Sequence, residues 1–397
     1  MRLITDIERR SRLARRHAIS PQHRVADAEA AIEAMLALHA TEPATPYLST
    51  FARTEQSTPQ TLEDAQVSSR TVVKQLAMRR TVFLFNTSRL PQVLGGPSAR
   101  VARQESTKLR KDIEAAAIAE DGQIWMDTAR SAVLNALKDH REASAQELRE
   151  QLPELSGQVS WFAHKPYGNV QHIAPRVLSW MGAAGDLVRG GNDGTWRTNR
   201  HRWARMDDWF GEPVEHADPR TAYEALVSEY LRAFGPVTET DLVWWFGTTK
   251  RAIRDALADL AAVQVQLERD QRGWVLPDDE EPEPPVEPWA AVLPALDPTS
   301  LGWKEKDFYL PPDFYPSIFD WSGNCGTTAW WNGQIIGSYV QDDAGHVELL
   351  IGRDPGIAGR KALQAQSKRL DDWLDGTRIN AAYKSPMSKV HRTAAQP

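Results

Sequence analysis

Residues 218–276, DPRTAYEALVSEYLRAFGPVTETDLVWWFGTTKRAIRDALADLAAVQVQLERDQRGWVL, contain the pattern that decides the fold. Asp218 is an N-cap residue with Pro219 at the first helical position, and apolar residues then recur at helical spacing up to Phe234. Gly235 and Pro236 interrupt this spacing. The first part of the stretch therefore predicts one amphipathic helix that ends before Gly235.

The rest of the stretch predicts two more helices and a hairpin. Thr238 precedes a short helix over 239–246, and Thr248 starts another after the break at Gly247. Two strand-like runs follow, 263–268 and 273–276. Three helices followed by a hairpin is the order of a winged helix, whose third helix normally enters the major groove of DNA.

The same order recurs twice nearer the N-terminus, which indicates an internal repeat. One copy has predicted helices at 128–140, 144–151 and 171–184, then a hairpin of 186–189 and 195–198 around the turn 190–194. The other copy has predicted helices at 4–17, 25–39 and 62–78 and a strand at 81–85, and 90–120 is a predicted helical connector.

The C-terminal part has a different pattern. Residues 282–288 are rich in Pro and Glu, which predicts an extended linker. Strand-like runs at 327–331, 334–340 and 346–351 predict a β-meander, and 356–374 is a predicted helix. The α+β chain is therefore divided as follows: first winged-helix module 1–95, connector 96–121, second module 122–210, third module 211–281, linker 282–288, β-rich domain 289–377 and a basic, poorly ordered tail 378–397.

The composition excludes several classes of protein. With 397 residues, 41% hydrophobic and 25% charged, the chain is typical of a globular protein of two to four domains. A single cysteine, Cys325, excludes a disulfide framework within one chain. The sequence has no signal peptide, membrane span, cofactor-binding fingerprint or metal-ligand spacing, so we expect a cytoplasmic monomer without cofactor or metal.

The charge distribution is uneven, although the net charge is −6. Residues 1–24 contain seven Arg against two acids, whereas 278–288 contain six acids and no base. A third charged stretch surrounds the second predicted hairpin and contains five arginines that could bind DNA phosphates. They are Arg189, Arg197, Arg200, Arg202 and Arg205. The alternative is that such charged stretches are ordinary solvated surfaces.

A candidate catalytic motif follows the second predicted helix, in the sequence LHATEPATPYLS of residues 38–49. Pro43 and Pro46 are expected to stop that helix, because proline lacks an amide donor and restricts the residue before it. His39 and Thr41 would then lie two residues apart in an extended segment, where both side chains could hold one water molecule. The alternative is that His39 is a buried core histidine or a helix C-cap.

This motif resembles the winged-helix DNA glycosylases typified by AlkZ and YcaQ. In that family a Gln-apolar-Gln or Gln-apolar-Asp motif occupies this place and positions the hydrolytic water, and His39-Ala40-Thr41 occupies it here. Residues 293–297, LPALD, with Leu301-Gly302, resemble the family's entry into its C-terminal domain. The resemblance covers most of the chain and implies three tandem winged-helix modules followed by a C-terminal β-barrel-like domain.

The resemblance also implies an activity, the hydrolysis of the N-glycosidic bond of N-alkylated purines in duplex DNA. N7-alkylguanine is the expected substrate, and interstrand crosslinks are a possible one. His39 and Thr41 would position water, and the nearby carboxylates of Glu42 and Asp297 are candidates for electrostatic support of the sugar cation. Because His and Thr replace the family's amide and carboxyl side chains, a non-catalytic DNA-binding protein, for instance a transcription regulator, is the alternative.

Overall fold

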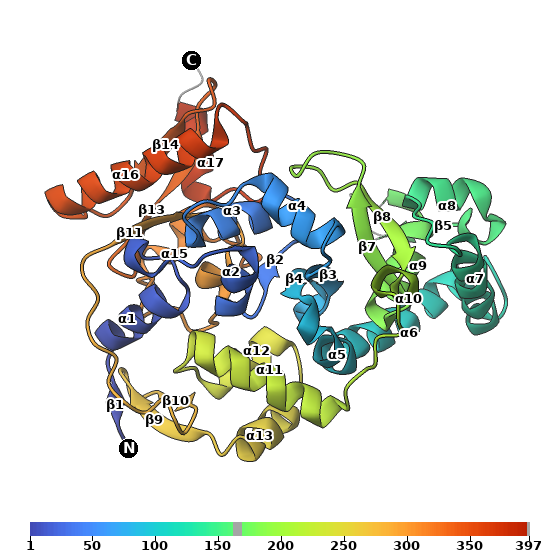
Figure 1. The fold of residues 1–397 in the computed structure, drawn as a ribbon, viewed down its shortest axis with the longest axis horizontal. Coiled ribbons are helices and arrows are strands. Elements are labelled where there is room, and N and C mark those ends of the chain that lie inside the picture. Colours follow the sequence, from blue (N-terminus) through green and yellow to red (C-terminus); the bar gives the residue numbers. More distant parts are fainter. Residues whose placement is uncertain (162–168, 395–397) are drawn as a thin grey trace. The chain divides into compact units, whose positions relative to one another are not determined.

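The computed structural model describes residues 1–161 and 169–394. The chain forms two compact units, one made of residues 1–65 and 223–397 and the other of residues 66–222. We call them unit 1 and unit 2. Both units contain helices and antiparallel strand pairs (Figure 1), which confirms the predicted α+β class.

Unit 1 is built from both ends of the sequence. Its N-terminal elements are β1 Leu3–Ile4, α1 Asp6–Arg16, α2 Ala28–Ala34, β2 Leu38–His39 and α3 Thr45–Arg53, and α4 Pro59–Val67 spans its boundary. The chain returns in α11 Pro219–Phe234, which spans the second boundary, and continues with α12 Glu239–Phe246, α13 Lys250–Asp259, β9 Val263–Leu267 and β10 Arg272–Val275. The C-terminal elements are β11 Ala290–Leu293, α14 Pro298–Leu301, α15 Tyr315–Ile318, β12 Thr328–Trp331, β13 Gln334–Gln341, β14 Val347–Ile351, α16 Gly356–Leu374 and α17 Pro386–Ala394.

The three helices and the hairpin predicted for 218–276 are all present. Thr238 caps α12 in a capping box with Asp241, and Gly247 ends that helix with a φ of 59°. Thr249, rather than the predicted Thr248, caps α13. The N-terminal strand β1 adds to the β9–β10 hairpin as a parallel third strand, with Leu3 opposite Gln266, a pairing that sequence alone did not indicate.

The C-terminal strands form one antiparallel sheet in the order β11-β12-β13-β14. Helix α16 has the predicted bounds and packs Leu363 into a core cluster with Ala290, Ala329 and Ile336 of this sheet. The prediction of a poorly ordered tail after residue 377 is wrong for residues 386–394, which form α17.

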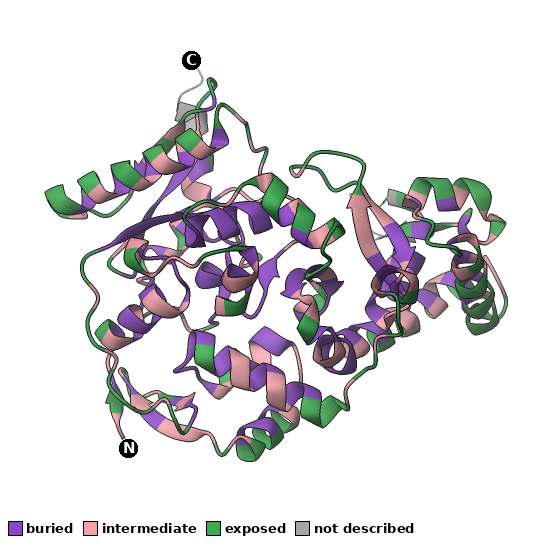
Figure 2. Ribbon diagram, viewed as in Figure 1, coloured by how far each residue is buried: buried purple, intermediate pink, exposed green. Residues whose placement is uncertain are grey.

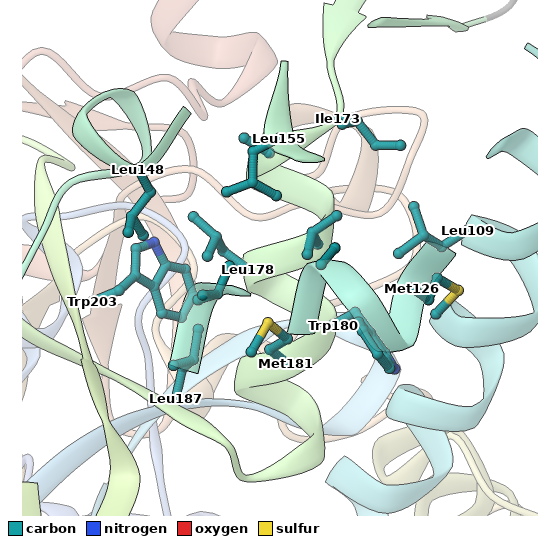
Figure 3. Close-up of a cluster of buried hydrophobic side chains, with 14 of the residues drawn as sticks. Leu109, Met126, Leu148, Leu155, Ile173, Leu178, Trp180, Met181, Leu187 and Trp203 are labelled. Carbon is teal, nitrogen blue, oxygen red and sulfur yellow. The ribbon is translucent and has the colours of Figure 1, made fainter. Parts of the chain in front are cut away.

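The described residues of unit 2 form three antiparallel strand pairs and a set of helices. The hairpins pair β3 Val72–Leu76 with β4 Val82–Asn86, β5 Gln158–Trp161 with β6 Asn169–His172, and β7 Leu187–Asn192 with β8 His201–Arg205. The helices are α5 Leu90–Val93, α6 Ala99–Ala115, α7 Gly122–Ala136, α8 Ala145–Gln151, α9 Ala174–Ala184 and α10 Met206–Phe210. Aliphatic and aromatic side chains of α6 to α9 and of β7 and β8 pack into one core, in which Leu178, Met181 and Trp203 lie side by side (Figure 3).

Two predicted elements of unit 2 are wrong. Residues 72–76 form a strand instead of the end of a helix, because the residues of VVKQL pair with the apolar strand β4. The second strand of the β7–β8 hairpin begins at His201, not at Thr195, so the loop at its tip is longer than the sequence suggested. No helix among the described residues is long and apolar enough to cross a membrane.

Candidate functional site

The helix before the candidate motif ends earlier than predicted. Helix α2 ends at Ala34, and the amide of Met35 closes its last turn. Leu36 then has a φ of 60°, a left-handed conformation that is uncommon for a residue other than glycine. Because no Gly or Pro marks this end, the prediction that the helix continues to His39 was wrong. His39 instead ends the short strand β2.

The structure brings His39 and Thr41 together. The backbone N–H of Thr41 donates to Nδ1 of His39 at 3.4 Å, so the neutral imidazole has its hydrogen on Nε2. His39 is buried and Thr41 is exposed. The pair therefore lies where the protein interior meets solvent, at the end of β2 and in the residues that follow it.

Helix α3 follows the motif directly in the chain and anchors it. Pro46 lies in the first turn of this helix and so starts a helix, where we had predicted that it ends one. All nine residues of α3 are buried (Figure 2), and Thr45 donates from its hydroxyl to the carbonyl of Ala295 at 2.8 Å. The motif is thus attached to a helix that is fixed inside unit 1.

The carboxylate of Asp297 belongs to that attachment. It has no exposed surface, and it accepts two hydrogen bonds from Arg53 at 2.8 Å, one from the Ser49 hydroxyl at 2.7 Å and one from the Thr299 amide at 2.9 Å. Burial alone would raise the pKa of Asp297, but Arg53 and these donors hold it below its usual value. Asp297 therefore ties α3 to the start of α14.

Glu42 is also engaged within the protein. Its two carboxylate oxygens accept from the amide of Ala382, at 3.0 and 3.1 Å, across 340 residues of sequence. Burial raises the pKa of Glu42, and the amides of Ala382 and Tyr383 and the charge of Lys384 oppose that shift. Sequence reasoning selected Glu42 by its place beside the motif and gave no signal of its partner.

The five predicted DNA-binding arginines lie on the β7–β8 hairpin and differ in their surroundings. Arg197 and Arg200 are exposed in the loop at its tip. Arg202 pairs with Asp193 and Glu147, both at 2.8 Å, and Arg205 lies 3.6 Å from Asp208. The guanidinium of Arg189 lies over the Trp203 ring, 4.6 Å from its centre, and burial lowers the pKa of Arg189 to about 10.

His201 and Lys74, of which sequence reasoning missed Lys74, accompany Arg189. Burial, with the charges of Arg189 and Lys74, lowers the pKa of His201 to about 3, so this imidazole is neutral. Lys74 comes from β3, whose residues pack beside β7. No sequence spacing relates Lys74 to the hairpin, because tertiary packing creates the group.

The arginines near the N-terminus have partners in the acidic stretch of residues 278–288. Arg12 and Arg16 both bind Asp279, at 2.9 and 2.7 Å, and Arg15 binds Glu283 at 2.7 Å. Arg12 is almost fully buried. The two oppositely charged stretches of the sequence therefore neutralise each other, and the basic N-terminal stretch is not a surface left over for nucleic acid.

The candidate site residues divide between the units. His39, Thr41, Glu42 and Asp297 belong to unit 1, and the five arginines belong to unit 2. Within residues 1–161 and 169–394, no cluster of three or more His, Cys, Asp or Glu side chains could hold a metal ion.

Comparison with known proteins identifies the family. Residues 32–373 match the family described as DNA glycosylase AlkZ-like, and the chain therefore belongs to this family, as the motif had indicated. Membership makes the protein a DNA repair glycosylase by family and implies DNA as its partner. The match begins just before His39 and includes all five arginines.

One solved structure shows the same fold. The DNA glycosylase AlkZ of Streptomyces sahachiroi aligns with a TM-score of 0.74 at 17% sequence identity, and the alignment covers 94% of this chain and 98% of that one. None of the curated proteins compared with the chain matches it.

Proposed function

We propose that the protein is a monofunctional DNA glycosylase that hydrolyses the N-glycosidic bond of N-alkylated purines, with N7-alkylguanine as the principal substrate and interstrand crosslinks as a further one. The observation that supports this most directly is the family match over residues 32–373, which includes the motif. The hydrogen bond between Thr41 and His39 is consistent with the motif acting as one unit.

The proposed chemistry needs no strong acid. An alkyl group on N7 makes guanine cationic, so the bond from C1′ to N9 breaks with both electrons going to the base, which leaves neutral. The sugar then has oxocarbenium character, water adds its oxygen to C1′, and one water proton is lost. The products are the free alkylated base and an abasic site. The protein has to orient the water and stabilise positive charge.

His39 and Thr41 are the proposed water-positioning pair. With Nδ1 accepting the Thr41 amide, the imidazole presents an N–H at Nε2, and the Thr41 hydroxyl can both donate and accept. Exposure of Thr41 allows a bound nucleotide to reach this residue. Glu42 and Asp297 would assist through the scaffold, because their carboxylates are engaged by protein donors.

The proposed DNA contacts use the architecture implied by the family. Three tandem winged-helix modules and a C-terminal β-barrel-like domain would form the platform of a monomer. The arginines of the β7–β8 hairpin would contact phosphates of damaged duplex DNA, with the exposed Arg197 and Arg200 foremost. Bulky adducts favour an open cationic surface over a tight pocket for a flipped base.

The test is release of base from duplex DNA that contains N7-methylguanine. We expect mass spectrometry to detect free N7-methylguanine, and alkali to cleave the DNA at the resulting abasic sites. His39→Ala and Thr41→Ala should each slow single-turnover release by about 10²-fold, the range that positioned proton donors and acceptors supply. Thr41→Ser keeps the hydroxyl and should retain most of the rate.

The outcomes separate the candidate functions. Release that is unchanged in both alanine variants would remove His39 and Thr41 from the mechanism and leave the glycosylase proposal standing. If folded wild-type protein releases no base from any alkylated duplex but binds one DNA sequence selectively, the protein is a non-catalytic DNA-binding protein and the proposal fails.

A further inference from the structure

Residues 377–385, which we call the C-terminal strap, cross unit 1 between α16 and α17. Besides the Arg378 guanidinium, which donates to the Asp343 carbonyl at 3.2 Å, the strap is attached at three places. Gln341 of β13 donates to the carbonyl of Thr377 at 3.0 Å and accepts from the amide of Ile379 at 2.8 Å. Farther along, Ala382 binds Glu42, and the hydroxyl of Ser385 lies 3.2 Å from that of Ser338.

The last attachment is close-packed. A side chain at Gly326 would place its Cβ 2.3 Å from the Ser385 amide nitrogen, so the strap lies directly against the chain before β12. Ser385 itself is buried. Two of the three attachments therefore hold the strap on the C-terminal sheet, and the contact with Glu42 connects it to the N-terminal part of unit 1.

A cavity lies under the strap, beside the Glu42 contact. The space that the centres of water-sized spheres can occupy in it is about 80 Å³, and its lining combines strap residues with residues of α3 and β13. Thr45 and Leu48 line it from α3, and Arg378, Asn380 and Lys384 line it from the strap. The cavity separates the strap from α3, and Glu42 lies at its edge. The hydrogen bond from Ala382 to Glu42 therefore connects the strap to the N-terminal part of unit 1 beside an open space.

Glu42 follows Thr41 directly, so its tether acts on the motif. Between β2 and α3, residues 40–44 form no regular helix or strand. Both Glu42 oxygens face the Ala382 amide, which directs the carboxylate toward the strap backbone. The carboxylate of Glu42 therefore connects the residue after Thr41 to the strap backbone.

We propose that the C-terminal strap, acting through Glu42, holds the His39–Thr41 segment in its working geometry, and that Glu42 is a positioning residue of the site. This inference rests on the proposed glycosylase function. Small displacements of groups that orient a nucleophile are costly, since a shift of about 1 Å can slow a reaction by roughly 10²-fold.

The experiment compares Glu42→Ala with Glu55→Ala in the full chain. Glu55 is an exposed glutamate of the same unit whose carboxylate lies 3.3 Å from Arg24, so it is a matched control for loss of a carboxylate. We expect Glu42→Ala to slow single-turnover base release by 10- to 100-fold without changing the dissociation constant for the same DNA. Glu42→Gln keeps one acceptor oxygen, so its rate of base release should lie between the rates of wild type and of Glu42→Ala.

Amide hydrogen exchange supplies the second measurement. Glu42→Ala should speed exchange at Ala382 and also at residues 40–42, and Glu55→Ala should do neither. The proposal is overturned if Glu42→Ala speeds exchange at Ala382 but changes neither the exchange at residues 40–42 nor the rate of base release. That result would leave the glycosylase function intact.

The exchange measurement also separates the two proposals. If wild-type protein releases no base at all, the proposed function fails by itself. Exchange at residues 40–42 then still decides whether the strap controls the motif, and an unchanged rate there in folded Glu42→Ala overturns the inference.

Discussion

The carboxylate of Asp297 has no surface in contact with solvent, and two nitrogens of Arg53 face it at 2.8 Å. Removing both charges from water is expensive, and the pair is tolerated because Ser49 and Thr299 add further hydrogen bonds. The ion pair fixes α3, on which the motif depends. A single carboxylate near a candidate site can thus stabilise the helix that carries the site and have no contact with substrate.

Breaking this pair should be more harmful than deleting it. Asp297→Asn leaves the Arg53 guanidinium buried without a counter-charge and should cost about 3–5 kcal/mol of unfolding free energy. The double variant Arg53→Leu/Asp297→Leu should recover at least half of that loss. Urea unfolding of the three proteins measures this, and a double variant less stable than Asp297→Asn contradicts it.

His17 gives a prediction for pH. It is fully buried, bonded to the Thr299 hydroxyl and the Ala233 carbonyl, and burial followed by the charge of Arg53 lowers its pKa to about 3. Since the unfolded chain binds a proton near pH 6.5 and the folded chain does not, stability is lost as pH falls below 6.5.

This imidazole should therefore remove about 2 kcal/mol of unfolding free energy between pH 7 and pH 5. Urea unfolding at both pH values measures the loss in wild type, to which His201 also contributes because its pKa is lowered in the same direction. His17→Gln should show a smaller loss over the same range, whatever its stability at pH 7. An equal loss in both proteins would show that His17 is protonated in the folded state.

At the scale of elements, the β7–β8 hairpin distinguishes arginines by their existing partners. Within the described residues, no ion pair of Arg200 is seen, whereas Arg202 already binds Asp193 and Glu147. A phosphate has to compete with two carboxylates at Arg202 and with water at Arg200. Equal charge in the sequence therefore does not mean equal availability to DNA.

Arg200→Ala should reduce the slope of log affinity against log salt by about 0.9, the value for one lost phosphate contact. Arg202→Ala should change the slope by less. Fluorescence anisotropy with an undamaged duplex between 50 and 200 mM salt measures both. A larger change in slope for Arg202→Ala would mean that its carboxylate partners release it on binding.

Elements with their own start and stop signals could be predicted from sequence. Thr238 and Gly247 bound α12, and helix α16 has its predicted ends. Helix α2 was extended too far because Leu36 adopts a left-handed conformation without being Gly or Asn. Strand β3 was missed because its pairing with the neighbouring strand β4 outweighs the helical spacing of its apolar residues.

In the candidate site, too, features that are local in the sequence could be predicted and features that depend on long-range contacts could not. His39 and Thr41 were found because the motif is contiguous in sequence. The partner of Glu42 lies 340 residues away, and the group of Arg189, Lys74 and His201 comes from separate hairpins, so no local spacing reports either. Local chemistry selected the residues, and long-range packing determines what each of them contacts.

At the scale of the whole molecule, opposite charges from distant parts of the sequence neutralise each other within unit 1. Asp279 and Glu283 together engage three arginines of α1. A net charge counted over the N-terminal stretch alone therefore overestimates its attraction for DNA. The linker predicted to be a spacer is part of the folded structure.

Asp279→Asn/Glu283→Gln should lower the melting temperature by roughly 4–8 °C, equivalent to about 2 kcal/mol, because Arg12 is buried. It should also strengthen binding to undamaged DNA. The control Glu280→Gln/Glu287→Gln changes the net charge equally at two exposed residues of the same stretch. Equal melting temperatures for the two double variants would show that the ion pairs add nothing to stability.

The pairing of α1 with residues 279–285 also affects how this protein can be divided or fused. A proline- and glutamate-rich stretch invites a cut or an inserted reporter, since such stretches usually tolerate both. Here a cut after Pro282 would place Arg15 and its partner Glu283 on different fragments, and an insertion there would disturb the same ion pair. The loop of residues 193–200 is different, because the paired strands β7 and β8 hold its two ends together. A break there would leave the ion pairs of α1 untouched.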